Sequence, residues 1–299
     1  MIAYLFPGQG SHAIGMGQEA YEKSSAARDI FMQADDILGF ALSDICFNGP
    51  QDTLTDTVNQ QPALFVTSMA ILKAGQEAGD VPAADFMAGH SLGELSALCA
   101  SGAISFEEGL RLVRTRGELM KAAGEKFPGG MAAVIGLKTE QVTIACEKAA
   151  AETNKQVQLA NDNCPGQIVI SGEPDAVERA GVLMQEMGAR KVVPIAITIA
   201  AHSSLMAPAA IEFSTALESV SIHTPSVPVI GNTTAAPLTT SDEIRAELQA
   251  QLTGSVRWTE SMQYLVTKGV TEIYEVGSGD VLKSLMKRID RKVARKKFA

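Results

Sequence analysis

Residues 85–103 read DFMAGHSLGELSALCASGA, and this order of apolar residues and glycines indicates the fold class. The apolar run before the first glycine predicts a buried strand, and the segment ELSALCASGA predicts a helix. Between them, GHSLG (89–93) fits the G-x-S-x-G pattern of a sharp strand-to-helix turn, which presents a serine hydroxyl at a helix N-terminus. A serine in this place is either a nucleophile or an ordinary helix N-cap. Because both a strand and a helix flank the turn, we interpret Ser91 as a nucleophile.

The segments on either side indicate an α/β protein with an insertion. Helical spacing of apolar residues appears near 60–77 and 106–123, and a short apolar run, IAYLF, opens the chain as a predicted strand. The middle of the chain then follows the order β-α-β-β-α-β, which is typical of a ferredoxin-like layer. These elements are predicted at 131–136, 139–152, 156–161, 167–171, 174–187 and 190–196. We therefore expect a small subdomain at 128–196, inserted into a larger α/β subdomain of 1–127 and 197–299.

Composition excludes several classes of protein. Hydrophobic residues make up 46% and the formal net charge is −9, which allows a sizeable core and argues against nucleic acid as a partner. No stretch offers about 20 uninterrupted apolar residues, and the N-terminus does not resemble a signal peptide. The four cysteines are far apart and form no C-x-x-C pair. We expect reduced thiols, no metal site, no membrane span and a cytoplasmic location.

A serine nucleophile needs a base, and the chain has four histidines. His90 adjoins the serine and should project away from it, while His223 precedes Thr-Pro in a predicted surface turn. His12 follows the first loop and remains a weaker candidate. His202 closes the apolar run VVPIAITIAA at the end of a predicted strand, where α/β folds place catalytic groups, so it is the best candidate. No acidic residue is marked as a third member, and a backbone carbonyl is the alternative.

The first loop, FPGQGS (6–11), has two interpretations. Gly8-x-Gly10-x-x-Ala13 after a strand satisfies the dinucleotide fingerprint, which would indicate an oxidoreductase. The loop could instead deliver a backbone N–H to an oxyanion hole. Pro7 directly before the first glycine weakens the dinucleotide interpretation, which also leaves the serine turn without a purpose.

Taken together, these motifs resemble a known family. FPGQGS (6–11), GHSLGE (89–94), Arg116-Gly117, NCPGQ (163–167), His202 and Gly231-Asn232 occur in the order found in the malonyl-CoA:acyl carrier protein transacylases, and the resemblance covers essentially the whole chain. It implies an α/β-hydrolase-like large subdomain with an inserted ferredoxin-like small one. It also implies malonyl-CoA and acyl carrier protein as partners, a monomer, and no cofactor.

The resemblance implies a role for individual residues. Ser91 would be acylated with His202 as its base, and the backbone N–H groups of Gln9 and Leu92 would form the oxyanion hole. The backbone carbonyl of Gln251 would orient the base. Three further residues would bind the substrate: Arg116, Asn163 and Gln61. Arg116 would bind the free carboxylate of the malonyl group. A guanidinium fork suits a carboxylate, although Arg111 and Arg114 share its stretch and a solvated role is the alternative.

Other functions stay open at this point. Ala201 stands where malonyl-selective members often have Ser or Phe, which leaves room for a larger acyl group, whereas Leu92 favours malonyl. A serine thioesterase, a non-catalytic binding module and a stand-alone polyketide acyltransferase are the competing interpretations.

The basic C-terminal segment is either a docking surface for an acidic carrier protein or a solvated helix end; its basic residues are Lys287, Arg288, Arg291, Lys292, Arg295, Lys296 and Lys297.

Overall fold

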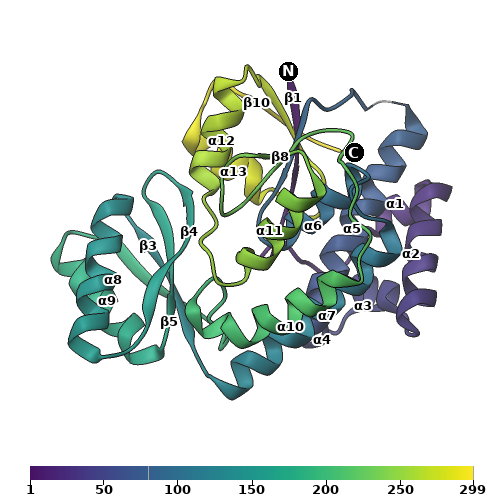
Figure 1. Ribbon diagram of the computed structural model, residues 1–299. Helices are drawn as coiled ribbons and strands as arrows, with labels where there is room; N and C mark the ends of the chain where they lie inside the picture. The colour runs from purple at the N-terminus through teal and green to yellow at the C-terminus, as the bar shows by residue number, and fades with distance from the viewer. Residues whose placement is uncertain (80, 299) are drawn as a thin grey trace.

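The protein contains two β-sheets of different size (Figure 1). The structure is a computed structural model that describes residues 1–79 and 81–298. The larger sheet has six strands, and all its neighbouring strands run parallel except the last pair, β7 and β8. Its strands, in spatial order, are β10 (Ala294–Lys297), β9 (Glu272–Glu275), β1 (Ile2–Phe6), β2 (Phe86–Gly89), β7 (Val229–Ile230) and β8 (Pro237–Leu238).

Helices cover both faces of this sheet because successive side chains of its buried strands point to opposite sides. On β1, Tyr4 and Phe6 join the main core, whereas Ala3 and Leu5 join a second core on the other face. The main core is packed by α2 (Ser25–Leu38), α5 (Thr57–Ala78), α6 (Leu92–Ala100), α7 (Phe106–Lys126), α10 (Ala207–Glu218) and α11 (Ser241–Gln251). The second core is packed by α12 (Trp258–Thr267) and α13 (Val281–Ile289). Short helices α1 (Gln18–Lys23), α3 (Leu42–Asn48) and α4 (Gln51–Thr55) complete this part.

The smaller sheet is formed by the middle of the chain, which Figure 1 shows in teal at one side of the molecule. Its four strands lie in the order β4-β5-β3-β6, every neighbouring pair is antiparallel, and α8 and α9 share a core with them. The elements are β3 (Gly130–Ile135), α8 (Thr139–Thr153), β4 (Val157–Cys164), β5 (Gln167–Gly172), α9 (Pro174–Glu186) and β6 (Lys191–Ile195). They follow the order expected from the sequence, with ends displaced by a few residues.

Strand β4 attaches the small sheet to the rest of the molecule. The N–H of Asp162 donates to the Val256 carbonyl at 2.9 Å, and the N–H of Val256 donates to the Ala160 carbonyl at 2.8 Å. The chain enters and leaves the small sheet at one point, where the Gly129 N–H donates to the Thr198 carbonyl at 3.0 Å. The loop around Val256 is therefore held against β4 by backbone hydrogen bonds.

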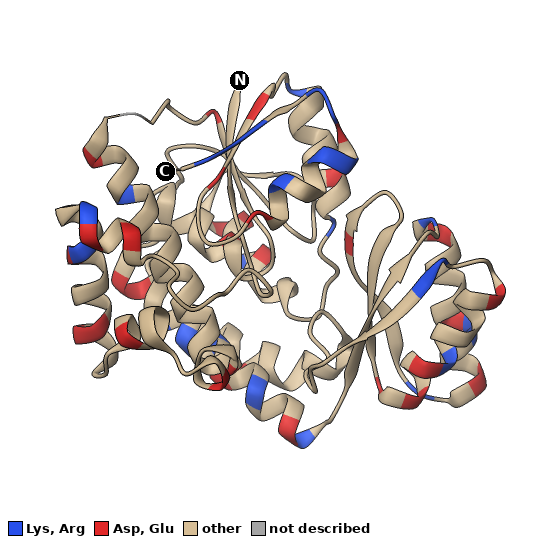
Figure 2. Cartoon of the chain, turned by 180° about the vertical axis from the view of Figure 1, so that it is seen from behind, with Lys and Arg blue, Asp and Glu red and all other residues tan. Residues whose placement is uncertain are grey.

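The basic C-terminal segment differs from the expected solvated helix end. Helix α13 stops at Ile289, and residues Ala294–Lys297 form β10, a parallel strand at the edge of the large sheet. Figure 2 shows its Lys and Arg residues following one another along this edge. Lys296 pairs with Glu272 of the neighbouring strand at 2.5 Å. Charged side chains are typical of edge strands because they discourage pairing with another chain.

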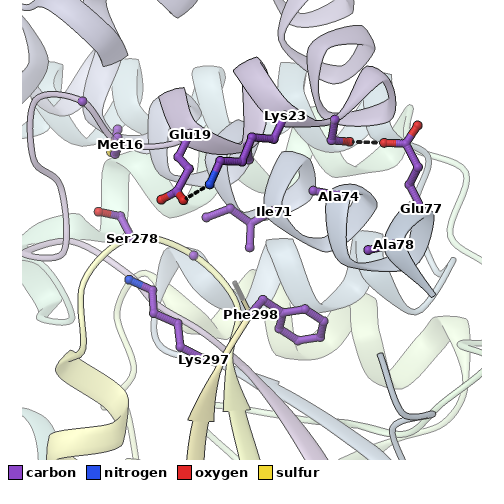
Figure 3. Close-up of a pocket in the computed structure, with 15 residues that line it drawn as sticks. Met16, Glu19, Lys23, Ile71, Ala74, Glu77, Ala78, Ser278, Lys297 and Phe298 are labelled. Atoms are coloured by element: carbon purple, nitrogen blue, oxygen red, sulfur yellow. Dashed lines mark hydrogen bonds and ion pairs between the residues drawn. The ribbon is translucent and has the colours of Figure 1, made fainter. Parts of the chain in front are cut away.

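A cavity of about 670 Å³ lies between α1, α5 and the C-terminal strand (Figure 3). Its apolar lining includes Met16, Ile71 and Phe298, and the Lys23–Glu19 ion pair lies at its edge. None of the site residues predicted from the sequence lines it.

Within the described residues, no helix has the length and apolar character needed to cross a bilayer.

Candidate active site

The turn between β2 and α6 holds Ser91 in a strained backbone conformation. Its φ is 53° and its ψ is −108°, a region that costs a non-glycine residue about 1–2 kcal/mol. The turn is too tight for side chains on either flank. A Cβ on Gly89 would lie 1.8 Å from the Gly93 carbonyl oxygen, and one on Gly93 would lie 2.0 Å from the Phe6 carbonyl oxygen. The two glycines of the motif are therefore needed for the backbone itself.

Asn232, which follows β7, ties this turn in place. Its side-chain oxygen accepts the Ser91 N–H at 2.7 Å, and its side-chain nitrogen donates to the Gly89 carbonyl at 2.7 Å. The Asn232 N–H in turn donates to Glu94 Oε1 at 2.9 Å. Both side chains are buried. The sequence showed Gly231-Asn232 only as part of a motif, and the available signal was an asparagine two residues after the short apolar run VPVI.

Ser91 and His202 form a hydrogen-bonded pair, with Ser91 Oγ 2.8 Å from His202 Nε2. The other ring nitrogen, Nδ1, lies 2.9 Å from the Gln251 carbonyl and 3.1 Å from the Gly254 carbonyl. Because carbonyl oxygens only accept, Nδ1 must carry the proton, and the Nε2 lone pair faces the serine hydroxyl. Burial, reinforced by the nearby Arg116 charge, lowers the pKa of His202 to about 3. The imidazole is therefore neutral near neutral pH, and its Nε2 accepts the hydrogen bond of the Ser91 hydroxyl.

His202 does not lie at a strand end as the sequence suggested. Strand β6 stops at Ile195, and His202 lies in the turn before a short 3₁₀ helix (Ser204–Met206) with a φ of 58°. The apolar run continues past the strand because residues 197–201 return to pack on the main core. From β4, Gln158 Nε2 donates to the His202 carbonyl at 3.2 Å and its Oε1 accepts the Ser204 N–H at 3.2 Å. The small sheet thus supports the base.

The other histidines make contacts elsewhere. His90 Nε2 lies 2.8 Å from Asn163 Oδ1, and its ring is 5.4 Å from the Trp258 ring. His12 lies 2.8 Å from Gln60 Nε2, while His223 is exposed. Of the residues predicted to bind substrate, Asn163 therefore contacts His90 rather than the serine.

Arg116 reaches the serine from α7 and is only 1% exposed. One terminal nitrogen donates to Ser91 Oγ at 3.1 Å and to Gln251 Oε1 at 2.9 Å, and the other donates to Gln61 Oε1 at 2.9 Å. Within residues 1–79 and 81–298, its Nε has no hydrogen-bond partner and no carboxylate forms an ion pair with it. Burial lowers its pKa to about 10, so it remains charged at neutral pH. A buried cation without an anionic partner suits an anionic ligand.

The neighbouring arginines of the same helix are different. Arg111 pairs with Glu107 at 2.9 Å and Arg114 pairs with Glu118 at 2.7 Å, both one helical turn away. The structure thus separates three arginines that the sequence left nearly equivalent, because only Arg116 lies on the buried face of α7 beside the serine.

Two backbone N–H groups lie close to the serine. Strands β1 and β2 pair with Phe6 opposite Gly89, so the loops that follow them run side by side. They touch, since a Cβ on Gly8 would lie 2.2 Å from the His90 carbonyl oxygen. In the described part of the chain, neither the Gln9 N–H in the first loop nor the Leu92 N–H at the start of α6 has a hydrogen-bond acceptor. A helix N-terminus with free N–H groups favours negative charge.

Five residues from five separate parts of the chain are thus brought together around the serine: Ser91, His202, Arg116, Gln61 and Gln251. No group of three or more His, Cys, Asp and Glu side chains suited to a metal ion occurs in the part that the structure describes.

Comparison with known proteins identifies one family of similar chains. Residues 3–282 match the family model described as an acyl transferase domain. The chain is 46% identical over 292 residues to the malonyl CoA-acyl carrier protein transacylase of Bacillus subtilis, covering 98% of this chain and 91% of the relative. It superposes on the acyl-carrier-protein-S-malonyltransferase of Bartonella henselae with a TM-score of 0.95 and 43% identity, covering 99% of this chain and 95% of that one. A malonyl-transacylase solved in complex with a type II polyketide acyl-carrier protein gives a TM-score of 0.95 at 38% identity, with 99% and 95% covered.

Proposed function

This chain belongs to the acyl transferase domain family, and on that premise we propose that it transfers a malonyl group from malonyl-CoA to the phosphopantetheine thiol of an acyl carrier protein. The observation that carries the proposal is the buried Arg116 guanidinium, which lies beside a serine–histidine pair and has no carboxylate partner among the described residues. Malonyl differs from acetyl by one carboxylate, and a guanidinium matches it with two parallel hydrogen bonds. A simple thioesterase would not need this group.

The reaction proceeds in two halves through an acyl-serine. His202 Nε2 takes the proton of Ser91 Oγ as this oxygen attacks the thioester carbonyl of malonyl-CoA. The N–H groups of Gln9 and Leu92 stabilise the resulting oxyanion, each contributing about 2.7–4 kcal/mol in the transition state. His202 returns the proton to the departing thiolate of coenzyme A. In the second half, the carrier thiol gives its proton to His202 and its sulfur attacks the acyl-serine carbonyl. The bond between the acyl carbon and Ser91 Oγ then breaks, and His202 returns the proton to Ser91 Oγ.

Three further residues support the base and the guanidinium or contact the residue before the nucleophile. The Gln251 carbonyl, 2.9 Å from His202 Nδ1, holds the base in the required tautomer. Gln61 supports Arg116 through its side-chain oxygen. Asn163 contacts His90, the residue before the nucleophile, through its side-chain oxygen.

We also propose the α/β-hydrolase-like and ferredoxin-like description of the two subdomains, with residues 128–196 as the inserted one. The strand order β6-β3-β5-β4 with two helices on one side supports it. The site is complete within one chain, so a monomer suffices. Four free cysteines suit the reducing cytoplasm.

Intact-protein mass spectrometry with malonyl-CoA tests the proposal. We expect a malonyl adduct that maps to Ser91, is absent from Ser91→Ala and is discharged when acyl carrier protein is added. Release of free malonate at the rate of adduct loss without a carrier would instead establish a hydrolase. Fatty acid synthesis is the proposed context, and a polyketide role would appear as faster discharge by a polyketide carrier than by a fatty acid carrier.

A further inference from the structure

We propose that Glu94 is a positioning residue for acyl-group selectivity, because through Gln251 it sets the orientation of the Arg116 guanidinium. This inference deepens the proposed malonyl transfer and rests on it. Glu94 lies in the first turn of α6 and is fully buried. It does not contact Ser91 Oγ or His202, so the mechanism described above does not use it.

The contacts of Glu94 join two elements that support the nucleophile. Its Oε1 accepts the backbone N–H of Asn232 at 2.9 Å, and its Oε2 accepts a hydrogen bond from Gln251 Nε2. Asn232 holds the serine turn through Ser91 and Gly89. Gln251 ends helix α11 and holds both His202, through its carbonyl, and Arg116, through its side chain. One carboxylate therefore fixes both supports.

The neighbours of Gln251 leave its amide only one orientation. Its Nε2 lies 3.0 Å from the Ser91 carbonyl, which can only accept, and its Oε1 lies 2.9 Å from Arg116, which can only donate. The same NH₂ group must then face Glu94. Since the second contact of Glu94 is a backbone N–H, both carboxylate oxygens meet donors, which is the pattern of an ionised carboxylate.

Opposing influences act on the pKa of Glu94. Burial raises this pKa well above its usual range and the neighbouring Glu247 carboxylate adds to this, while the hydrogen bonds from Gln251 and Asn232 and the Arg116 charge offset only part of the rise. The charged form is the one that the contacts of Glu94 require, because both of its oxygens accept hydrogen bonds. The Glu94 charge in turn raises the pKa of Arg116, against the larger lowering caused by burial. The amide of Gln251 lies between the two charges, so Glu94 compensates the guanidinium without occupying the fork.

This separation matters for the substrate. A direct ion pair would give the guanidinium an anionic partner from the protein itself before the malonyl carboxylate binds. Instead, two amide oxygens hold the guanidinium, one from Gln61 and one from Gln251, each at 2.9 Å. If the Gln251 amide turned over, its NH₂ would face Arg116, and the guanidinium would lose one of its two supports on the side nearest Ser91.

Glu94→Gln is the test, because it keeps the size of the side chain but places an NH₂ group opposite a donor. The Gln251 amide must then turn or lose its partner. We measure kcat/KM for malonyl-CoA and for acetyl-CoA at saturating carrier protein, and we expect the malonyl-to-acetyl ratio to fall at least about tenfold, as for one lost charge-assisted hydrogen bond. An equal fall for both substrates, with the ratio unchanged, would show mere structural support and overturn the proposal.

Glu275→Gln is the matched control. Glu275 is also fully buried and accepts two N–H groups, from Leu282 at 3.0 Å and Lys283 at 2.9 Å, but at the start of α13 away from the site. The Glu275→Gln variant should be less stable than the unmodified chain, but its malonyl-to-acetyl ratio of kcat/KM should be unchanged. If Glu94→Gln does not fold, Glu94→Asp, which keeps the charge and retracts it by one methylene, is measured by the same ratio with the same two outcomes.

Exchanging the two side chains gives an independent check. In Glu94→Gln with Gln251→Glu, the new carboxylate lies directly against Arg116 and takes the place of the malonyl carboxylate as its anionic partner, and it can no longer donate to the Ser91 carbonyl. We expect the malonyl-to-acetyl ratio to fall at least as far as in Glu94→Gln alone, and a ratio restored to that of the unmodified chain would contradict the role given to the amide between the two charges. Failure of the proposed function is distinguishable, since the unmodified chain would then form no malonyl-serine.

Discussion

Replacing Arg116 with alanine should convert a malonyl-selective enzyme into one that no longer distinguishes malonyl from acetyl. The substitution removes a guanidinium that is 1% exposed and contacts Ser91, Gln61 and Gln251. It affects both substrates to some extent, because the 3.1 Å contact to Ser91 Oγ is lost in either case. Only the malonyl substrate also loses the partner of its carboxylate.

The magnitude follows from the hydrogen bonds available. A hydrogen bond to a charged group contributes about 1.5–3 kcal/mol, and a buried carboxylate left without a partner costs at least as much. Since about 1.4 kcal/mol corresponds to a factor of ten, one lost bond lowers kcat/KM for malonyl-CoA by about tenfold to a hundredfold relative to acetyl-CoA. Loss of both bonds of the fork would lie beyond that range, so tenfold is the lower bound.

The assay compares kcat/KM for the two thioesters with the same acyl carrier protein, in the unmodified chain and in each variant. Arg111→Ala is the control, since Arg111 lies on the same helix but is exposed and pairs with Glu107 one turn away. It should leave both values within about twofold, as surface substitutions usually do. If Arg116→Ala lowered both substrates by the same factor, the guanidinium would not be reading the carboxylate.

Two further predictions concern the base and the turn. The pKa of His202 falls from an ordinary 6.5 to about 3 in the folded chain, so the unfolded chain binds the extra proton first and stability falls as pH drops below 6.5. Relative to His202→Gln, the free energy of unfolding should therefore decrease by about 2 kcal/mol between pH 7.5 and pH 5 in urea titrations, and an unchanged difference would contradict a neutral buried imidazole. Gly89→Ala places a methyl group 1.8 Å from the Gly93 carbonyl oxygen and should lower the free energy of unfolding by more than about 3 kcal/mol. Gly102→Ala, with a φ of +76° but open space around it, should lower it by about 1 kcal/mol. Equal losses in urea titrations would mean that the turn is not sterically restricted.

Local patterns predicted much of this fold. The elements of the inserted segment appear in the expected order because their apolar spacing and flanking turns are properties of neighbouring residues. The serine turn follows from the same kind of information, since Gly89 and Gly93 are required by contacts within a few residues and with the adjacent strand. The C-terminal strand was missed because ARKK has no apolar alternation, and its pairing with β9 becomes evident only once the sheet is assembled.

The amino-acid sequence alone was enough to single out Ser91 as the proposed nucleophile and to predict the strand and helix that present it, since such a turn is encoded by residues adjacent in the chain. The packing of the folded chain was needed to show which arginine faces that serine, that His202 lies in a turn rather than on a strand, and that Gln251 contacts the base and the guanidinium at once. Those answers depend on hydrogen bonds between residues as far apart as Ser91 and Gln251. Such contacts leave no local periodicity, because they are set by how the two sheets and the helices between them pack together.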